Sequence, residues 1–205
     1  PIAEEKDLNV HLGVAKILKA YVYLTLVDVY GDVPFTEALQ GIDGVFNPNV
    51  DQGSTIYTAA LALLTEARTD LANTAGGGLT RDIYYGGNRT KWITLANSIE
   101  LKAQLNLSAE VSNSAAKAAI QALITANDLI DTDAEEFTYK YGTSSVPTNS
   151  RSVAYQDYYG VNAGSAGGYI GNYFLYHMYR DPNLKVQDPR WRYYFYRQVG
   201  SRARA

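Results

Sequence analysis

The sequence contains no cysteine, and it has one methionine and two histidines among its 205 residues. Without cysteine the chain can form neither disulfides nor thiolate metal sites. The histidines, His11 and His177, are far apart in the chain and belong to no ligand or catalytic motif. No apolar run reaches the roughly 20 uninterrupted residues that a membrane span needs. The sequence therefore predicts neither a disulfide scaffold nor a bilayer-spanning segment.

The short motifs of common enzyme classes are also missing. There is no G-x-S-x-G turn, no Walker phosphate loop and no H-E-x-x-H pair. Gly76, Gly77 and Gly78 are not followed by Lys and Ser or Thr, so they are interpreted as a helix stop. Carboxylates are present, but nothing singles out a pair for glycoside hydrolysis. We predict a ligand-binding protein and not an enzyme, with no catalytic residues, no metal ligands and no cofactor.

Charge is distributed unevenly along the chain. Residues 1–150 carry 10 basic and 18 acidic side chains, whereas residues 151–205 carry 8 and 3. Such asymmetry marks a nucleic-acid or membrane contact, or one side of an internal interface. Asp131, Asp133, Glu135 and Glu136 crowd together, and hard cations such as Ca²⁺ favour clustered carboxylates. Because the glycine and the spacing of an EF-hand are missing, we interpret this cluster as a solvated helix end.

The apolar stretch from Leu8 to Tyr30 is the feature around which the rest is organised. Its apolar residues recur at three- and four-residue steps and leave little of the circumference polar, which predicts a helix buried on several sides. The helix carries Lys16, Lys19, Thr25 and Asp28, so we expect it to lie in protein and not in lipid. Gly31 and the proline three residues later predict its end.

Three further helices follow from the same periodicity. They are expected at about Ser54–Asn73, Thr90–Leu107 (with Thr90 as N-cap) and Ser114–Ile130. Their expected buried stripes are Ile56, Ala60, Leu63, Leu64, Ala67 and Leu71; Trp92, Leu95, Ala96, Ile99 and Ala103; and Ala116, Ile120, Leu123 and Ile124. The predicted fold class is mainly α, with tetratricopeptide-like helical hairpins and long irregular loops. A helical core at about 8–130 would precede a loop-rich region at about 131–205.

Four segments of the chain resemble the SusD/RagB family. AKILKAYVYLTLVDVYGDVP is similar to the family's first core helix, and IYTAALALLTEARTDLA to its second. RDIYYGGNRTKWITLANSIELKAQLNLS matches a further family segment, although Gln104 and Asn106 stand where more basic residues are expected. Asp188, Pro189 and Arg190 match a late D-P-R motif. Because the segments occur in family order, the chain is identified as a single-domain fragment, roughly the N-terminal half, of a SusD-like protein.

The resemblance implies a function and a location. SusD-like proteins are outer-membrane, cell-surface lipoproteins, anchored by an N-terminal lipid that would lie outside this chain. They bind oligosaccharides, or peptides in RagB-type members, and deliver them to a SusC-type TonB-dependent transporter for nutrient uptake. Glycan binding is the expected function, with a peptide importer as the alternative. The helices would mostly face the transporter, and the loops would contact the nutrient.

The candidate ligand contacts therefore lie on loops rich in Tyr, Gly, Ser and Asn. Tyrosine offers a flat face and a hydroxyl at little cost in side-chain entropy, and binding loops use this mixture. The expected contacts are Asn47, Asn49, Asp51, Tyr158, Tyr159, Asn162 and Tyr169. Packing against the rest of the protein is the open alternative for the same tyrosines.

Two other functions compete with nutrient binding. A general helical-repeat scaffold would bind a protein partner. Nucleic acid could stack on the arginine- and aromatic-rich stretch 190–197, but this is the weaker reading, and we predict no nucleic-acid partner.

Overall fold

The computed structural model describes residues 8–73, 77–109, 113–144, 146, 150–153, 172–179 and 188–190. The chain divides into two compact units, residues 1–140 and residues 141–205. That the chain is a single domain of a larger protein stays a prediction.

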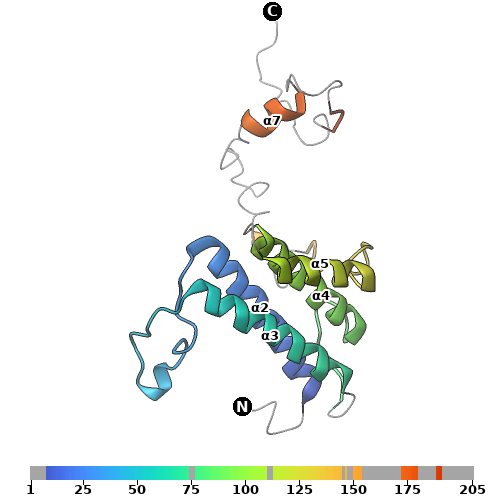
Figure 1. Ribbon diagram of the computed structural model, residues 1–205. Coiled ribbons are helices and arrows are strands. Elements are labelled where there is room, and N and C mark those ends of the chain that lie inside the picture. Colours follow the sequence, from blue (N-terminus) through green and yellow to red (C-terminus); the bar gives the residue numbers. More distant parts are fainter. Residues whose placement is uncertain are drawn as a thin grey trace, which may run out of the picture. The chain divides into compact units, whose positions relative to one another are not determined.

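The described residues of the first unit form four α-helices and one short 3-10 turn. The helices are α2 (Asn9–Tyr30), α3 (Gly53–Ala72), α4 (Arg89–Ser108) and α5 (Ser114–Ala126), and the turn η1 spans Gly41–Asp43. α2 and α3 lie side by side, and α4 contacts both of them as well as α5 (Figure 1). Within the described residues there is no strand, only an isolated bridge between Val33 and Asp51. The predicted mainly-α fold is confirmed.

The central helix α2 buries one face and not its whole circumference. Its buried residues are Val10, Gly13, Ile17, Ala20 and Leu24. Tyr21 and Val22 are about half exposed, so the expected burial on several sides is not seen among the described residues of this unit. The helix ends as predicted, at Gly31, whose φ of 76° suits a residue without a Cβ.

By length and composition, α2 is also the one described helix that could cross a membrane. It packs along α3, and its Lys16 pairs with Glu66 and Asp70 of that helix at 2.9 Å each.

The predicted stripes of α3 and α4 form the core of the unit. Five of the six predicted α3 residues are buried, and Leu63 is partly buried. All five predicted α4 residues are buried: Trp92, Leu95, Ala96, Ile99 and Ala103. The α5 stripe is covered less, since Ala116 is its only buried residue and Ile124 is half exposed. The periodicity of the sequence thus identified the buried residues of α3 and α4, which pack against other helices, but not those of α5, which is covered less.

Three expectations about helix bounds need correction. The N-cap of α4 is Asn88 and not Thr90, because the Asn88 side chain accepts a hydrogen bond from Lys91 N at 3.1 Å. α5 ends at Ala126 and not at Ile130, because Asn127 adopts a left-handed conformation. A further helix, α7 (Asn172–Tyr179), lies in the region expected to be irregular. It contains neither Gly nor Pro, so nothing in it breaks a helix.

The described residues of the second unit are 141–144, 146, 150–153, α7 and 188–190. Met178 is buried, and its carbonyl accepts a hydrogen bond from Asp188 N at 3.0 Å. The Asp188 carboxylate in turn accepts hydrogen bonds from the backbone and the guanidinium of Arg190. These bonds, led by that of the guanidinium, lower the pKa of the Asp188 carboxyl. The D-P-R motif therefore forms a local turn tied to the end of α7.

Candidate functional site

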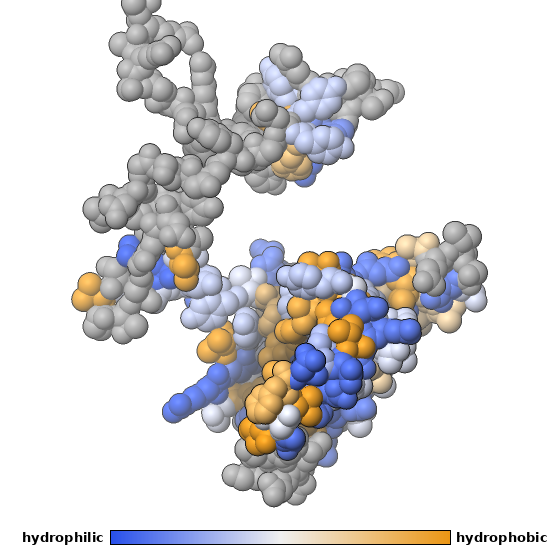
Figure 2. All heavy atoms as spheres, turned by 90° about the vertical axis from the view of Figure 1, so that its left-hand side faces the viewer, coloured by the Kyte–Doolittle hydropathy of each residue, from blue (hydrophilic) through white to orange (hydrophobic). Residues whose placement is uncertain are grey.

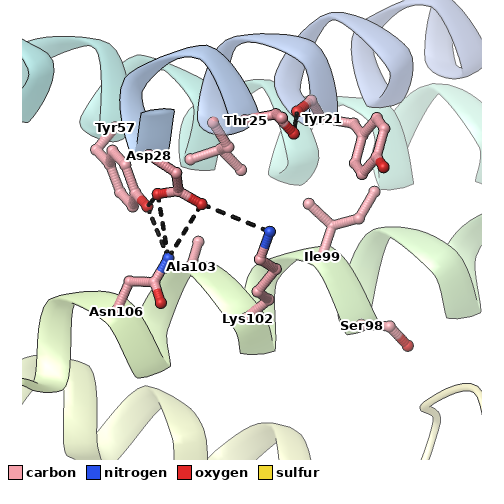
Figure 3. Close-up of a pocket in the computed structure, with 10 residues that line it drawn as sticks. Tyr21, Thr25, Asp28, Tyr57, Ser98, Ile99, Lys102, Ala103 and Asn106 are labelled. Atoms are coloured by element: carbon pink, nitrogen blue, oxygen red, sulfur yellow. Dashed lines mark hydrogen bonds and ion pairs between the residues drawn. The ribbon is translucent and has the colours of Figure 1, made fainter. Parts of the chain in front are cut away.

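A pocket of about 160 Å³ opens between α2, α3 and α4 (Figure 3). α2 contributes Tyr21, Leu24, Thr25 and Asp28, α3 contributes Tyr57, and α4 contributes Ser98, Ile99, Lys102, Ala103 and Asn106. A cavity of this size accommodates a single six-membered ring or one side chain.

One end of this pocket is polar and centres on Asp28. The Tyr57 hydroxyl donates to Asp28 Oδ1, and Asn106 Nδ2 lies 3.2 Å and 3.3 Å from the two carboxylate oxygens. Lys102 Nζ is 3.5 Å from Asp28 Oδ2. Burial, followed by the hydrogen bond to Asp28, raises the pKa of the Tyr57 hydroxyl, so it remains protonated and donating. The pocket thus combines apolar walls with a carboxylate already held by three partners.

The sequence had marked Asn106 as a departure from a more basic family position, and the structure shows its surroundings. Asn106 Nδ2 lies 3.0 Å from the Tyr57 hydroxyl as well as near Asp28. Because an amide is uncharged, Asn106 does not neutralise the Asp28 carboxylate. Lys102 is the positively charged group beside it, and the Lys102 side chain is largely exposed. The polar end of the pocket therefore suits a ligand that carries a hydrogen-bond donor or a positive charge on a small apolar group.

A second, wider groove of about 390 Å³ lies between the start of α2 and residues 79–84. Its apolar lining is Val14, Leu18, Leu79, Ile83, Tyr84 and Trp92, and its polar residues are His11, Thr80, Arg81 and Asp82. Trp92 is 1% exposed, so it offers no free face to a sugar. The groove is therefore a weaker candidate for aromatic stacking than its composition suggests.

Asp82 organises the loop beside this groove. Its carboxylate accepts hydrogen bonds from the backbone N–H groups of Tyr84, Tyr85 and Gly87 and from Trp92 Nε1, at 2.8–3.2 Å. Burial alone would raise the pKa of this carboxyl, but the bond from Trp92 and those from the backbone outweigh it, and the pKa is lowered. Asp82 is thus ionised at neutral pH, and its carboxylate holds the loop together through these bonds.

Replacing Asp82 by asparagine is expected to lower the free energy of unfolding at neutral pH by about 1.5–3 kcal/mol, since bonds to a charged acceptor are lost. A carboxyl with a lowered folded pKa contributes its stability above the unfolded pKa of about 4 and loses it as pH falls through the folded pKa. Denaturant unfolding of parent and variant between pH 7 and pH 2.5 should therefore show their difference shrinking below about pH 4. A difference that stays constant with pH would contradict the charged role of Asp82.

Side chains of α4 hold the segment after α5 in place through hydrogen bonds. Thr94 Oγ1 donates to Asp128 Oδ1 at 2.7 Å, Asn97 Nδ2 donates to Asp128, and Ser98 Oγ accepts from Ile130 N. Farther along, Lys91 Nζ donates to the Ala134 carbonyl at 2.6 Å. Asn97 and Ser98, which lie in the segment that is similar to the family, therefore help to hold the fold together.

Tyr85 fastens the same segment from the loop before α4. Its hydroxyl donates to the Glu135 carbonyl at 2.8 Å. Burial, followed by the charges of Asp82 and Glu135, raises the pKa of Tyr85 to about 12, so the hydroxyl keeps its proton at neutral pH.

Two of the three predicted contacts on the 32–53 loop are engaged inside it. The Asn49 side chain donates to the Glu37 carboxylate at 3.0 Å. The Asp51 carboxylate accepts from the backbone N–H groups of Thr36 and Phe35 at 2.9 Å and 2.8 Å, and these two bonds lower its pKa. Asn47 is exposed and has no hydrogen-bond partner among the described residues. Only Asn47 of the three presents an uncommitted amide.

The other four predicted contacts, Tyr158, Tyr159, Asn162 and Tyr169, lie outside the described residues. The structure adds two aromatic residues that the sequence did not single out as contacts. Tyr173 and Tyr176 of α7 are 77% and 49% exposed, and the exposed rings of a helix offer faces for stacking. Their helical setting could have been anticipated from the unbroken segment 172–179.

The acidic cluster 131–136 does not form a metal site in the described part of the chain. No group of three or more potential ligands converges among those residues. Glu135 instead accepts hydrogen bonds from Asp131 N and the Thr132 hydroxyl, and these bonds lower its pKa.

Comparison with known proteins gives one family. The model of the SusD-like_2 family, described as starch-binding and associating with the outer membrane, matches residues 2–204. No curated protein matches the chain.

Several solved structures are similar to it. A SusD-like protein from Bacteroidetes AC2a is 28% identical over 91% of this chain and 34% of its own, with a TM-score of 0.70. A SusD homologue from Bacteroides fragilis NCTC 9343 is 27% identical over 86% of this chain and 36% of its own, with a TM-score of 0.68. A chitin-binding protein is 35% identical over 61% of this chain and 26% of its own, with a TM-score of 0.52.

The chain spans only 26–36% of the length of these relatives. The likeness to these structures lies in the helical fold. With the family model matched across nearly its whole length, the chain belongs to the SusD-like family.

Proposed function

We propose that this chain is part of a cell-surface protein that binds a glycan and delivers it to a SusC-type TonB-dependent transporter. The observation that carries the proposal is the match of the SusD-like family model over residues 2–204. The protein would act by binding and not by catalysis. The protein would be anchored in the outer membrane by an N-terminal lipid. Helices α2–α5 would form tetratricopeptide-like hairpins that pack against the transporter.

A glycan ligand is favoured over a peptide by one comparison. The most identical of the three structures described above is a chitin-binding protein, at 35%. Neutral sugars present C–H faces to aromatic rings and hydroxyls to amides and carboxylates. We infer an oligosaccharide ligand, and N-acetylglucosamine oligomers are the first to test. A peptide importer of RagB type is the alternative outcome of the same test.

The expected ligand contacts are mainly aromatic residues of the second unit. They are Tyr158, Tyr159 and Tyr169, with Asn162 beside them in the sequence, and the exposed Tyr173 and Tyr176 of α7. On the first unit, Asn47 remains a proposed contact, whereas Asn49 and Asp51 would act by holding the loop that presents it.

Replacing Tyr158 and Tyr159 together by alanine should weaken glycan binding by tenfold or more. Stacking is worth roughly 1–3 kcal/mol per aromatic ring. The measurement is calorimetric titration of the full-length protein with N-acetylglucosamine oligomers, and separately with short peptides. The matched control is Tyr30→Ala, which removes a largely exposed tyrosine from the end of α2 and should leave affinity unchanged.

Two results would contradict this assignment. Unchanged affinity together with a lower melting temperature would show that the two tyrosines are packing residues. If the protein binds peptides but not glycans, the glycan proposal is wrong and the protein is part of a peptide importer.

A further inference from the structure

The segment between α2 and α3 leaves the helix pair as a loop and returns to it (Figure 1). The two ends of this loop are joined by the hydrogen bond from Asp51 N to the Val33 carbonyl at 3.0 Å. The Asp51 carboxylate also accepts from the backbone N–H groups of Phe35 and Thr36 at 2.8 Å and 2.9 Å. Figure 2 looks onto the side of the first unit on which the loop lies in Figure 1, and hydrophilic and hydrophobic side chains both reach that surface. The loop is thus a surface loop that is closed at its base.

The first arm of the loop is held against α2 by an aromatic contact. The Phe35 ring lies edge-to-face against Tyr23 with the ring centroids 4.7 Å apart, and Lys19 Nζ lies 4.9 Å from the Phe35 centroid. Aromatic pairs and cation–π contacts of this kind each contribute roughly 0.5–1.5 kcal/mol. Glu37 follows Phe35 by two residues and is partly buried. Its position is therefore fixed relative to the helix pair.

Glu37 joins the first arm of the loop to the second arm. Its Oε2 accepts from Asn49 N at 2.8 Å and from Asn49 Nδ2 at 3.0 Å, and its Oε1 accepts from the same Nδ2 at 3.2 Å. Hydrogen bonds to a carboxylate are roughly twice as strong as those between neutral groups. Both oxygens of Glu37 are thus engaged within the loop, and they hold a residue 12 positions later in the chain.

The order Asn47-Pro48-Asn49 passes this constraint on to Asn47. The proline ring fixes the φ of Pro48, and the residue before a proline is largely restricted to extended conformations. Once Asn49 is held by Glu37, few backbone conformations therefore remain for Asn47. The Asn47 amide is exposed, and it can donate and accept hydrogen bonds, as a sugar hydroxyl requires. A group that is held in place before the ligand arrives loses less conformational entropy on binding.

We propose that Glu37 is a positioning residue for glycan binding: it holds the Asn47 amide in place through Asn49 and does not itself contact the sugar. The inference rests on the proposed function, in which Asn47 is a ligand contact, and it adds the residue that fixes this contact. Glu37 acts on affinity by lowering the entropy that the loop loses when the glycan binds.

The test is calorimetric titration of the full-length protein with N-acetylglucosamine oligomers. Glu37→Ala removes the acceptor of Asn49 and should weaken binding by about threefold to tenfold, the effect of leaving one more group to be ordered on binding. The matched control is Asp43→Ala, which removes an exposed carboxylate of the same loop that forms no hydrogen bond among the described residues. This control should bind like the parent. Both variants should keep the melting temperature of the parent, because neither residue belongs to the helical core.

A double-mutant cycle separates positioning from a direct contact of Glu37 with the sugar. Asn47→Ala should weaken binding by about threefold to tenfold through the lost hydrogen bond. In that background Glu37→Ala should have no further effect, because the contact that Glu37 positions is gone. Asn49→Ala removes the same bonds from the other arm of the loop and leaves the charge of Glu37 in place, so it should weaken binding as much as Glu37→Ala does.

Three results would overturn the inference and leave the proposed function intact. They are parent affinity in Glu37→Ala, parent affinity in Asn47→Ala, and a loss from Glu37→Ala that persists in the Asn47→Ala background. The last result would show that Glu37 acts other than through Asn47, as a ligand contact or through its charge. If the parent itself binds no oligomer, the glycan proposal and the inference are both wrong.

Discussion

Replacing Trp92 by alanine is expected to lower the free energy of unfolding by about 3–5 kcal/mol. Trp92 is 1% exposed and stands with its ring edge-to-face against Tyr85 at 5.2 Å and against Phe137 at 5.8 Å. Its removal leaves a cavity between α4 and the loop before it, and Asp82 loses the indole donor. Denaturant unfolding of the full-length protein at neutral pH measures the loss.

The control for this prediction is Trp92→Phe, which keeps a ring in the cluster and removes the hydrogen bond to Asp82. It should lose about 1.5–3 kcal/mol, the typical contribution of a hydrogen bond to a charged group. Glycan affinity should be unchanged in whatever fraction of either variant is folded. Full stability with lost glycan binding would instead place Trp92 in the binding site.

Replacing Gly13 by alanine should lower the free energy of unfolding by about 1–3 kcal/mol. Helix propensity argues for the opposite sign, since alanine is favoured over glycine inside a helix by about 1 kcal/mol. Packing decides, because a Cβ at Gly13 would lie 2.8 Å from Leu71 Cγ and 3.0 Å from the Ala67 carbonyl oxygen of α3. The side chain of Leu71 can move, but the backbone of α3 can yield only by separating from α2.

Gly41→Ala provides the comparison, because a Cβ there would meet nothing within 4 Å. This variant should melt within a degree or two of the parent, whereas Gly13→Ala should melt several degrees lower. A Gly13→Ala protein that melts higher than the parent would show that propensity outweighs the contact and that α2 and α3 are packed less closely there.

The residues through which the chain resembles its family have a common physical role. Asp82 and Tyr85 close the loop before α4, and Asn97 and Ser98 hold the segment after α5. The bonds of Tyr85, Asn97 and Ser98 join residues that lie 31 to 50 positions apart in the chain. Such residues identify the family because they hold the fold together, and they carry no information about which nutrient is bound.

The candidate site was predicted less completely than the fold. The sequence proposed Asn47, Asn49 and Asp51 together, because their side chains have similar chemistry. In the structure they differ, since Asn49 and Asp51 bond to Glu37 and Thr36, which lie 12 and 15 residues earlier in the chain. The pocket at Asp28 could not be predicted either, since its lining comes from three helices.

The sequence by itself determined the helices, because an apolar stripe of helical period and the residues that end a helix are local properties of the chain. It located α2 and α3 to within a residue, and it identified the buried stripe of α4. Only the tertiary structure decided that Gly13 is a contact point, that Asp82 is a bonded anion and that Leu39, Ile42 and Phe46 face solvent. These properties depend on what lies across the fold from each residue, and that is set by packing and hydrogen bonds between segments distant in the sequence.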